Sequence, residues 1–472
     1  MAAKVAHVTD AKTGARRERT GSQGAAAIAW CVGVLLVVGM MLVLAVPRPS
    51  ERKYPDRIPV HFWHVWTAEW KTVADQIVDR YNESQDRYEV IPLSIPSNTA
   101  DSKFLMSVAG GVPPDVMAQW NPVIPKWAES GMLTALDELM SPEEWERFQK
   151  TVYPVVLKIG MYKGKLYGAI NGLDVYACYF RTDYAREVGL DPAKPPETLE
   201  ELSAWADKLT KYGPNGALKR IGLLSPLRPP SLSMFAPGFG GAFYDWSRGV
   251  LTLNTPENVR ALEFLSGERK KLGFDNVIGF ETSFTSEITN AAWPFIGGAY
   301  GITLDGQWRV EQIARYAPEL EYGTFPIPPP QGGNKHASWA NGNFLIIPKG
   351  AKQVEGAWEF VKFWSGIENP ERAAEFYTWG GWLPPIPAIA DAPVYREYLR
   401  NHPQFMTFVE MLPSAHLEPL PPVSYQAYLW DRLASADEAA ERGILSPEAA
   451  LRKLEKEIEH EVAMRRELGY KD

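Results

Sequence analysis

Apolar and polar residues after residue 58 follow two periods, which predict short strands alternating with amphipathic helices. Residues 60–66 form an apolar run of strand length, and residues 70–81 carry apolar side chains at the i, i+3, i+4 and i+7 spacing of a helix. Residues 88–93 alternate as a second strand, a helix ends at Gly110 and Gly111, and residues 115–118 form a third strand. This order predicts a parallel sheet with right-handed crossovers.

The rest of the chain continues the alternation. Residues 171–180 predict a strand that leaves the first domain, and residues 226–246, rich in Pro, Gly and aromatic residues, predict a long loop. Further expected elements are helices at residues 198–209, 357–364 and 446–469 and strands at residues 302–304 and 344–347. With 472 residues, the chain is long enough for two α/β domains.

One uncharged apolar run, residues 25–46, precedes these elements. About 20 apolar residues at about 1.5 Å each cross a hydrocarbon core of roughly 30 Å. We expect a cytoplasmic tail (residues 1–24), a transmembrane anchor or signal (residues 25–46) and a linker (residues 47–58). A single-pass anchor in the inner membrane, with the large domain periplasmic or extracellular, is favoured over a cleaved signal, because signal h-regions usually span about 7–15 residues.

The amino-acid composition limits the kinds of partner that the protein can bind. The net charge of −8 argues against nucleic acid, which binds basic surfaces. The two cysteines are Cys31, inside the apolar run, and Cys178, so we expect no internal disulfide. The 17 tryptophans are the unusual feature, because many of them adjoin Gly, Pro, Asn or Asp, and turns and loops carry binding surfaces.

The sequence lacks the residue patterns that metal binding, phosphate binding and serine hydrolysis require. His61 and His64 would face opposite sides of a strand, and no Cys/His cluster has the spacing of metal ligands. The Gly-rich stretch at residues 238–241 lacks the Lys-Ser/Thr ending of a phosphate-binding loop, and no Gly-x-Ser-x-Gly motif is present. We therefore expect no enzyme, no cofactor and no metal, although sequence alone leaves a glycosidase pair of carboxylates open.

Binding of a neutral polyol fits the chain better. A sugar ring has an apolar face and a rim of hydroxyls, so it requires flat aromatic rings beside fixed hydrogen-bonding groups. In open parallel sheets, ligands bind beyond the carboxyl ends of the strands. The candidate ligand-binding residues are Trp66, Glu69, Gln119, Trp120, Asn121, Asp174, Tyr244, Asp245, Trp246, Asp305, Trp308, Trp339, Asn341, Trp379 and Trp382. Clustered Arg and Lys, which bind phosphate or carboxylate, are lacking near these positions.

Several segments resemble the extracellular solute-binding proteins of ABC importers, in particular the carbohydrate-binding class that includes maltose-binding protein. The resembling segments are residues 108–116 (VAGGVPPDV), 162–168 (YKGKLYG), 305–308 (DGQW), 344–350 and 380–384 (GGWLP). The resemblance implies a two-lobed periplasmic-binding-protein type II fold that closes on ligand by a hinge, with an ABC permease as the membrane partner. It assigns residues 59–170 plus 335–384 to lobe 1 and residues 171–334 plus 385–472 to lobe 2.

By the same resemblance, Trp308 corresponds to an aromatic platform of the family, and Glu69, Trp120 and Asn121 to polar positions of the cleft. Two other functions remain open from the sequence, a membrane-anchored ligand sensor and a secreted glycan-degrading enzyme. In the favoured function, ligand stabilises the closed state that the permease recognises.

Overall fold

The computed structural model describes residues 30, 32–34, 52–120, 122–226, 229–283 and 293–470. The chain divides into two units, Met1–Asp56 and Arg57–Asp472, and the second unit is the one described below. Most of the expected tail, anchor and linker lies outside the described residues, although Trp30 and residues 32–34 are helical. Within the described part, no helix is both long and apolar enough to cross a membrane.

The first half of the sheet has the predicted parallel order. β1 (Ile58–His64) pairs in parallel with β2 (Tyr88–Ser94) and with β3 (Val116–Gln119). Two helices, α2 (Ala68–Ser84) and α3 (Ser97–Ala109), make the connections. α2 buries Ala74, Ile77, Val78 and Tyr81, which are four of the apolar residues at the predicted helical spacing. Its Asn82 side chain bonds both the N–H and the carbonyl of Val90 on β2.

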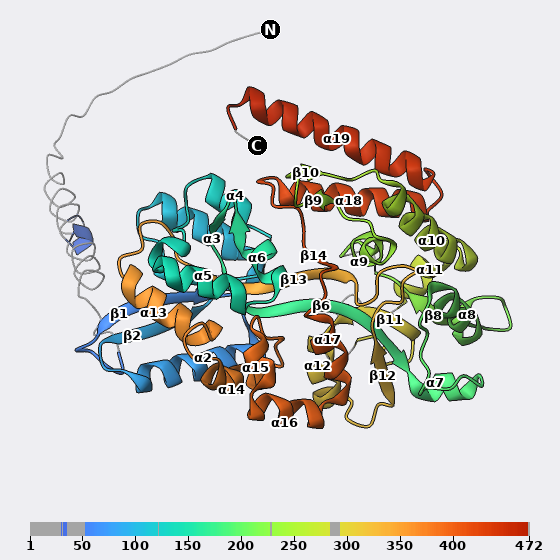
Figure 1. Cartoon of the computed structure of the whole chain (residues 1–472), viewed down its shortest axis with the longest axis horizontal. Coiled ribbons are helices and arrows are strands. Elements are labelled where there is room, and N and C mark those ends of the chain that lie inside the picture. The colour runs from blue at the N-terminus through green and yellow to red at the C-terminus, as the bar shows by residue number, and fades with distance from the viewer. Residues whose placement is uncertain are drawn as a thin grey trace, which may run out of the picture. The chain divides into compact units, whose positions relative to one another are not determined.

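One long strand, β6 (Ala169–Arg181), continues the sheet into its second half (Figure 1). β13 (Ser338–Ile346) lies between β3 and β6 and is antiparallel to both. Beyond β6 the order continues through β11 (Tyr300–Gly306), β8 (Leu218–Leu224) and β7 (Lys211–Tyr212), while β12 (Tyr322–Phe325) also pairs with β6. β6 therefore belongs to both halves of the sheet, as predicted for a strand that leaves the first domain.

Helices cover both halves. The first half carries α4 (Ile124–Glu129), η1 (Asp137–Leu139), α5 (Pro142–Thr151), α6 (Pro154–Gly160), the β4 (Met161–Tyr162) and β5 (Lys165–Leu166) hairpin, α13 (Val354–Ser365) and α14 (Pro370–Gly380). The second half carries α7 (Thr182–Glu187), α8 (Leu199–Leu209), α9 (Ser231–Phe235), η2 (Ala236–Phe239), the β9 (Tyr244–Asp245) and β10 (Val250–Leu251) hairpin, α10 (Pro256–Leu272), α11 (Phe274–Glu281) and α12 (Trp308–Tyr316). The C-terminal part contains α15 (Pro387–Asp391), α16 (Pro393–Asn401), η4 (Pro403–Phe405), α17 (Met406–Met411), β14 (Leu417–Glu418), α18 (Gln426–Glu441) and α19 (Pro447–Glu467).

The buried side chains form two hydrophobic clusters. One cluster contains Phe62, Trp127 and Phe344 of the first half and extends to Tyr179 on β6, and the other contains Leu202 and Leu262 of the second half with α18 and α19. α19 begins at the Ser446 N-cap, whose hydroxyl accepts from the Ala449 N–H, as the Ser-Pro signal predicts.

The prediction of a long loop at residues 226–246 is wrong for much of that segment. Every residue of α9 is buried, and η2 continues it directly. The chain turns tightly at Gly241, where an added Cβ would lie 2.2 Å from Asn258 Oδ1. The Pro and Gly residues therefore mark close packing rather than an exposed loop.

The assignment of residues after 385 to lobe 2 remains a prediction, and their contacts are mixed. α17 packs on β6 through Phe408 and Tyr179, whose ring centroids are 5.7 Å apart. The N–H of Tyr153, before α6, donates to the Pro385 carbonyl at 3.0 Å. This segment therefore lies against elements of both halves.

Candidate functional site

The predicted residues of β6, β11 and β13 meet where these three strands run side by side. Asp174 on β6 is directly paired with Asn341 on β13, so the two side chains point to the same face. β11 ends at Gly306, and Trp308 opens α12 just beyond it. Sequence positions more than 160 residues apart thus converge at the end of β11.

Four aromatic rings form a row at this junction, which we call the ring row: Trp308, Tyr176, Trp339 and Trp430. The Trp308 and Tyr176 centroids are 5.5 Å apart, Tyr176 and Trp339 are 5.2 Å apart, and Trp339 and Trp430 are 4.9 Å apart. Trp308 and Trp430 remain partly exposed. The buried ring N–H of Trp339 has no hydrogen-bond acceptor among the residues that the structure describes. Tyr176 and Trp339 are each 8% exposed, so the apolar surface that the row offers is that of Trp308 and Trp430.

Two carboxylates lie beside the ring row. Asp174 Oδ1 accepts from Gln307 Nε2 at 2.8 Å, and burial raises the pKa of Asp174 to about 6 against the opposing effect of that bond. Asp305 Oδ2 accepts from Arg309 Nε at 2.7 Å, and its Oδ1 accepts from the Gly306 N–H. Asp174 thus has an amide as its bonded partner, whereas Asp305 is paired with a guanidinium.

Arg309 is fully engaged at the edge of the site. Besides Asp305, its guanidinium donates to Gln312 Oε1 at 2.7 Å and lies 4.4 Å from the ring centroid of Trp293. Its charge is therefore directed to Asp305 and Trp293. This arrangement favours uncharged groups over phosphate beside the ring row.

Predicted residues of the first half of the sheet contact the junction or the helix that follows it. Trp120 is 42% exposed, and its carbonyl accepts from Asn341 Nδ2 at 3.0 Å. Glu69, in the first turn of α2, lines a cavity of about 20 Å³ together with Glu311 and Gln312 of α12. Gln119 is buried, where its amide donates to Asp101 at 2.6 Å and accepts from the Trp120 N–H. Asn121 lies outside the described residues.

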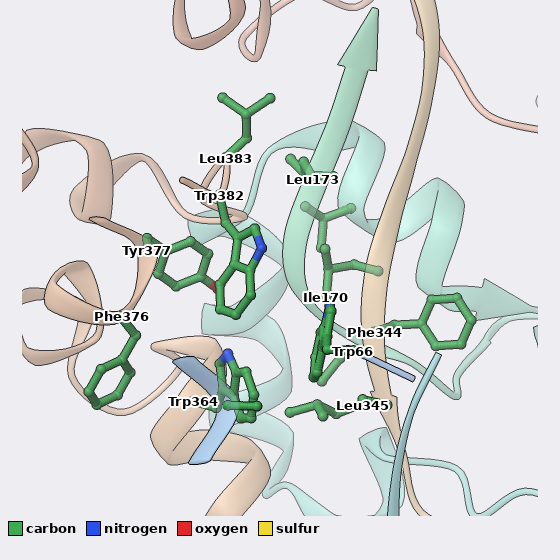
Figure 2. Close-up of a cluster of buried hydrophobic side chains, with 14 of the residues drawn as sticks. Trp66, Ile170, Leu173, Phe344, Leu345, Trp364, Phe376, Tyr377, Trp382 and Leu383 are labelled. Carbon is green, nitrogen blue, oxygen red and sulfur yellow. The ribbon is translucent and has the colours of Figure 1, made fainter. Parts of the chain in front are cut away.

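Trp66 and Trp382 pack in the core. Trp66 stacks on Trp364 of α13 at 5.2 Å, and Trp382 lies 5.5 Å from Trp66 and 5.9 Å from Trp364 (Figure 2). Only 8% of Trp66 and 5% of Trp382 are exposed. Because the rings cover one another, this packing gives no support to the expectation that both are open ligand platforms.

The predicted residues of the β9–β10 hairpin bond within the protein. Asp245 Oδ1 accepts from the Ser247 N–H and hydroxyl and from the Arg248 N–H, so this carboxylate holds the turn. The Trp246 ring N–H donates to Glu418 Oε2 at 2.9 Å, and Tyr244 packs edge-on against Trp246 at 5.1 Å.

Trp379 lies apart from the ring row. It is 39% exposed on α14 and borders a surface cavity of about 630 Å³ lined by Gln76, Asp79, Arg80 and Glu83 of α2. It also lines the small cavity beside Glu69. A larger cavity of about 840 Å³, which the sequence did not predict, lies in the second half between α8 and the proline segment at residues 326–329.

Two members of the ring row, Tyr176 and Trp430, were absent from the predicted site. Tyr176 lies within a buried stretch of β6 that reads as core. Trp430 follows the proline-rich segment at residues 419–422 by a short interval and lies on α18 with Tyr428. The sequence signal that could have identified Trp430 was the presence of aromatic residues near the start of a helix that follows several prolines.

Comparison with known proteins identifies the family. Residues 76–406 match the bacterial extracellular solute-binding proteins. The chain belongs to this family. The family functions outside the cytoplasm, and the relatives named next are binding proteins rather than enzymes.

The maltotriose-binding protein of Pyrococcus abyssi is 22% identical to this solute-binding protein over 374 residues, which cover 77% of this chain and 73% of the relative. The sn-glycerol-3-phosphate-binding periplasmic protein UgpB of Yersinia pestis is 22% identical over 365 residues, covering 74% and 78% of the two chains.

Solved structures share the two-lobed α/β fold. The protein CpMnBP1 with mannotriose bound has a TM-score of 0.71 and 25% identity, over 85% of this chain and 100% of that chain. The sugar-binding protein MalE of Xanthomonas citri has a TM-score of 0.70 and 23% identity, over 88% and 100%. The two-lobed fold that the sequence resemblance implied is therefore confirmed for this solute-binding protein.

Proposed function

We propose that this solute-binding protein binds a neutral sugar or oligosaccharide between its two lobes and delivers it to an ABC-type permease. The observation that carries the proposal is the ring row beside Asp174 and Asp305. Sugar rings stack on flat indole and phenol faces, and their hydroxyls bond carboxylates and amides. Relatives named for maltotriose and mannotriose binding support the same class of ligand.

The proposed contacts surround the junction of β6, β11 and β13. They comprise Trp308, Trp430, Asp174, Asp305, Asn341, Trp120 and Glu69, whereas Trp339, only 8% exposed, packs against Trp430 and supports its position. The relative named for sn-glycerol-3-phosphate raises an anionic ligand as the competing possibility. The pairing of Arg309 with Asp305 favours the neutral ligand, because an anion would have to displace a carboxylate bonded at 2.7 Å.

For the membrane side, we propose that residues 25–46 hold the domain outside the inner membrane as a single-pass anchor. The length and lack of charge of that apolar run support an uncleaved segment. The measurement is the mass of the mature protein after membrane fractionation. A protein that has lost its first 46 or so residues and leaves the membrane fraction would contradict the anchor.

The ligand proposal is tested by thermal unfolding of the full chain against neutral oligosaccharides, including maltotriose and mannotriose, and against sn-glycerol-3-phosphate. At a hundredfold excess over Kd, a ligand stabilises by about 2.7 kcal/mol. We expect stabilisation by at least one neutral oligosaccharide, none by the phosphate ester, and no product from the stabilising sugar by chromatography.

Trp308→Ala tests the ring row directly. We expect it to abolish the stabilisation while the melting temperature without ligand stays within a few degrees, because the ring is partly exposed. Tyr212→Ala is the control, since this ring is 52% exposed on β7 at the edge of the sheet, and it should keep the stabilisation. Loss of folding in Trp308→Ala would assign the ring to the core instead.

A further inference from the structure

Three side chains from distant parts of the chain meet next to the ring row, because Glu418 is the strand partner of Trp339. Lys158 Nζ lies 2.7 Å from Glu418 Oε1, and the Trp246 ring N–H donates to Glu418 Oε2 at 2.9 Å. Lys158 Nζ also lies 5.4 Å from the ring centroid of Trp246. Each of the three groups thus contacts the other two, and both oxygens of Glu418 are occupied.

The three residues connect the two halves of the fold. Lys158 is on α6, whose Val155 and Val156 pack in the hydrophobic cluster of the first half. Trp246 directly follows β9 in the turn of the β9–β10 hairpin, and the nearby Phe243 and Leu251 pack with the cluster of the second half. Glu418 is on β14, which pairs with the start of β13 at Trp339. A rotation of one half relative to the other must change these contacts.

The geometry suits a contact with a measurable free energy. Lys158 and Glu418 are 21% and 19% exposed, so solvent and salt screen this pair less than a fully exposed pair. Breaking it would leave a partly buried carboxylate with one of its two bonded partners. By contrast, the pair of Arg87 and Glu355 joins the residue before β2 to α13 within the first half, and both side chains are more than half exposed.

We propose that Lys158, Glu418 and Trp246 form an interlobe clasp that stabilises the arrangement of the two halves in this structure. The clasp sets the free-energy difference between this arrangement and one in which the two halves are rotated relative to each other. If the proposed function holds, the clasp also tunes sugar affinity without touching the sugar, because affinity depends on the population of the binding-competent arrangement. Trp246 then acts as a positioning residue rather than as the ligand platform that the sequence predicted.

The test measures the separation of the halves without any ligand. Spin labels at Met106→Cys on α3 and Tyr212→Cys on β7, both exposed positions, are introduced into the full chain carrying Cys31→Ser, since Cys178 is buried. Pulsed dipolar distances are compared for Trp246→Phe, which keeps a ring but loses the N–H, and for Lys158→Met. Arg87→Met is the matched control for loss of a salt bridge inside one half.

We expect Trp246→Phe and Lys158→Met to shift or broaden the distance distribution, and Arg87→Met to leave it unchanged. Distributions identical to that of the parent in both clasp variants would overturn the proposal. Circular dichroism of the labelled variants checks that they are folded. Glu418→Gln, which keeps the shape of the acceptor, is a third variant and should change the distance distribution in the same way.

A ligand arm separates this inference from the proposed function. A clasp predicts that Kd changes by about threefold or more, by one common factor for oligosaccharides of different length. A changed Kd with unchanged distances would mean that Trp246 touches the ligand, and the clasp would be rejected. If the parent binds no sugar at all, the proposed function fails, while the ligand-free distances still decide the clasp.

Discussion

At the residue scale, identical local signals led to different environments. Trp66 and Trp308 both follow a strand and adjoin turn or polar residues, yet Trp66 is covered by Trp364 and Trp382 whereas Trp308 borders Tyr176 and stays partly open. The residues that cover Trp66 are about 300 positions away in sequence. Neighbouring residues alone therefore could not distinguish a core ring from a surface ring.

Trp66→Ala should accordingly destabilise the protein. Removing a large buried aromatic side chain costs about 3–5 kcal/mol, because a cavity remains where the ring packed. The measurement is urea unfolding without ligand. Trp120→Ala, at an exposed ring, should change the free energy of unfolding by only about 0.5 kcal/mol. A comparably small loss in Trp66→Ala would restore Trp66 as a candidate ligand platform.

Asp174→Asn should make the protein more stable at pH 7.5 and weaken its sugar binding. The folded pKa of Asp174 is about 6, above the value near 4 of an unfolded aspartate, so the folded state retains its proton at higher pH. The contribution of Asp174 to the free energy of unfolding therefore falls as pH rises from about 4 to about 6. Asparagine keeps an oxygen for Gln307 without the buried charge, and we expect a gain of about 1–3 kcal/mol.

The gain in Asp174→Asn should disappear below about pH 4, where both states of the parent are protonated. Chemical unfolding of parent and variant across pH 3.5 to 8 measures it. A variant less stable than the parent at pH 7.5 would show that the charge is stabilised by the site, which would contradict burial as the dominant influence on this carboxyl.

At the element scale, the periodicity of apolar residues predicted which segments are strands and which are helices for most elements. Predictions made from Pro, Gly and Asn content were wrong where packing determines the backbone conformation. β2, β6 and α8 lie within a few residues of their predicted ranges. The apolar residues of α8 repeat at the period of one buried face, whereas β6 is an apolar run that is buried on both faces. β13 begins six residues before its predicted start, since its first part contains Asn341 and Gly342 and reads as a turn. That part becomes strand because β6 and β14 supply its partners.

Gln307 fixes the end of β11 to β6. Its buried amide accepts from the Val175 N–H at 3.2 Å and donates to the Leu173 carbonyl and to Asp174 Oδ1. Gln307→Leu would leave these backbone groups without their partner, so we expect a loss of about 2–4 kcal/mol in the free energy of unfolding and weaker ligand binding through displacement of Trp308. Denaturant unfolding measures the loss in the free energy of unfolding, and Gln331→Leu, at an exposed position, is the control. An unchanged free energy would mean that water replaces the amide.

At the scale of the whole molecule, the fold-family resemblance correctly predicted a two-lobed fold, while the lobe boundaries remain a prediction and the residues that meet at the junction were only partly predicted. Asp174, Asp305, Trp308, Trp339 and Asn341 come together because β6, β11 and β13 are neighbours, and the resemblance implied strands that cross between lobes. The partners of Trp246 could not be predicted, since Lys158 and Glu418 lie 88 and 172 positions away.

The late position of β13 in the chain has a consequence for biosynthesis. β13 separates β3 from β6, so the first half of the sheet stays open along both of these strands until residue 346 has been synthesised. During translation, roughly the first three quarters of the polypeptide must persist with unpaired strand edges, which are prone to aggregation. A nascent chain that cannot complete its fold early remains competent for passage through an export channel, and it depends on holding factors until its last strands emerge.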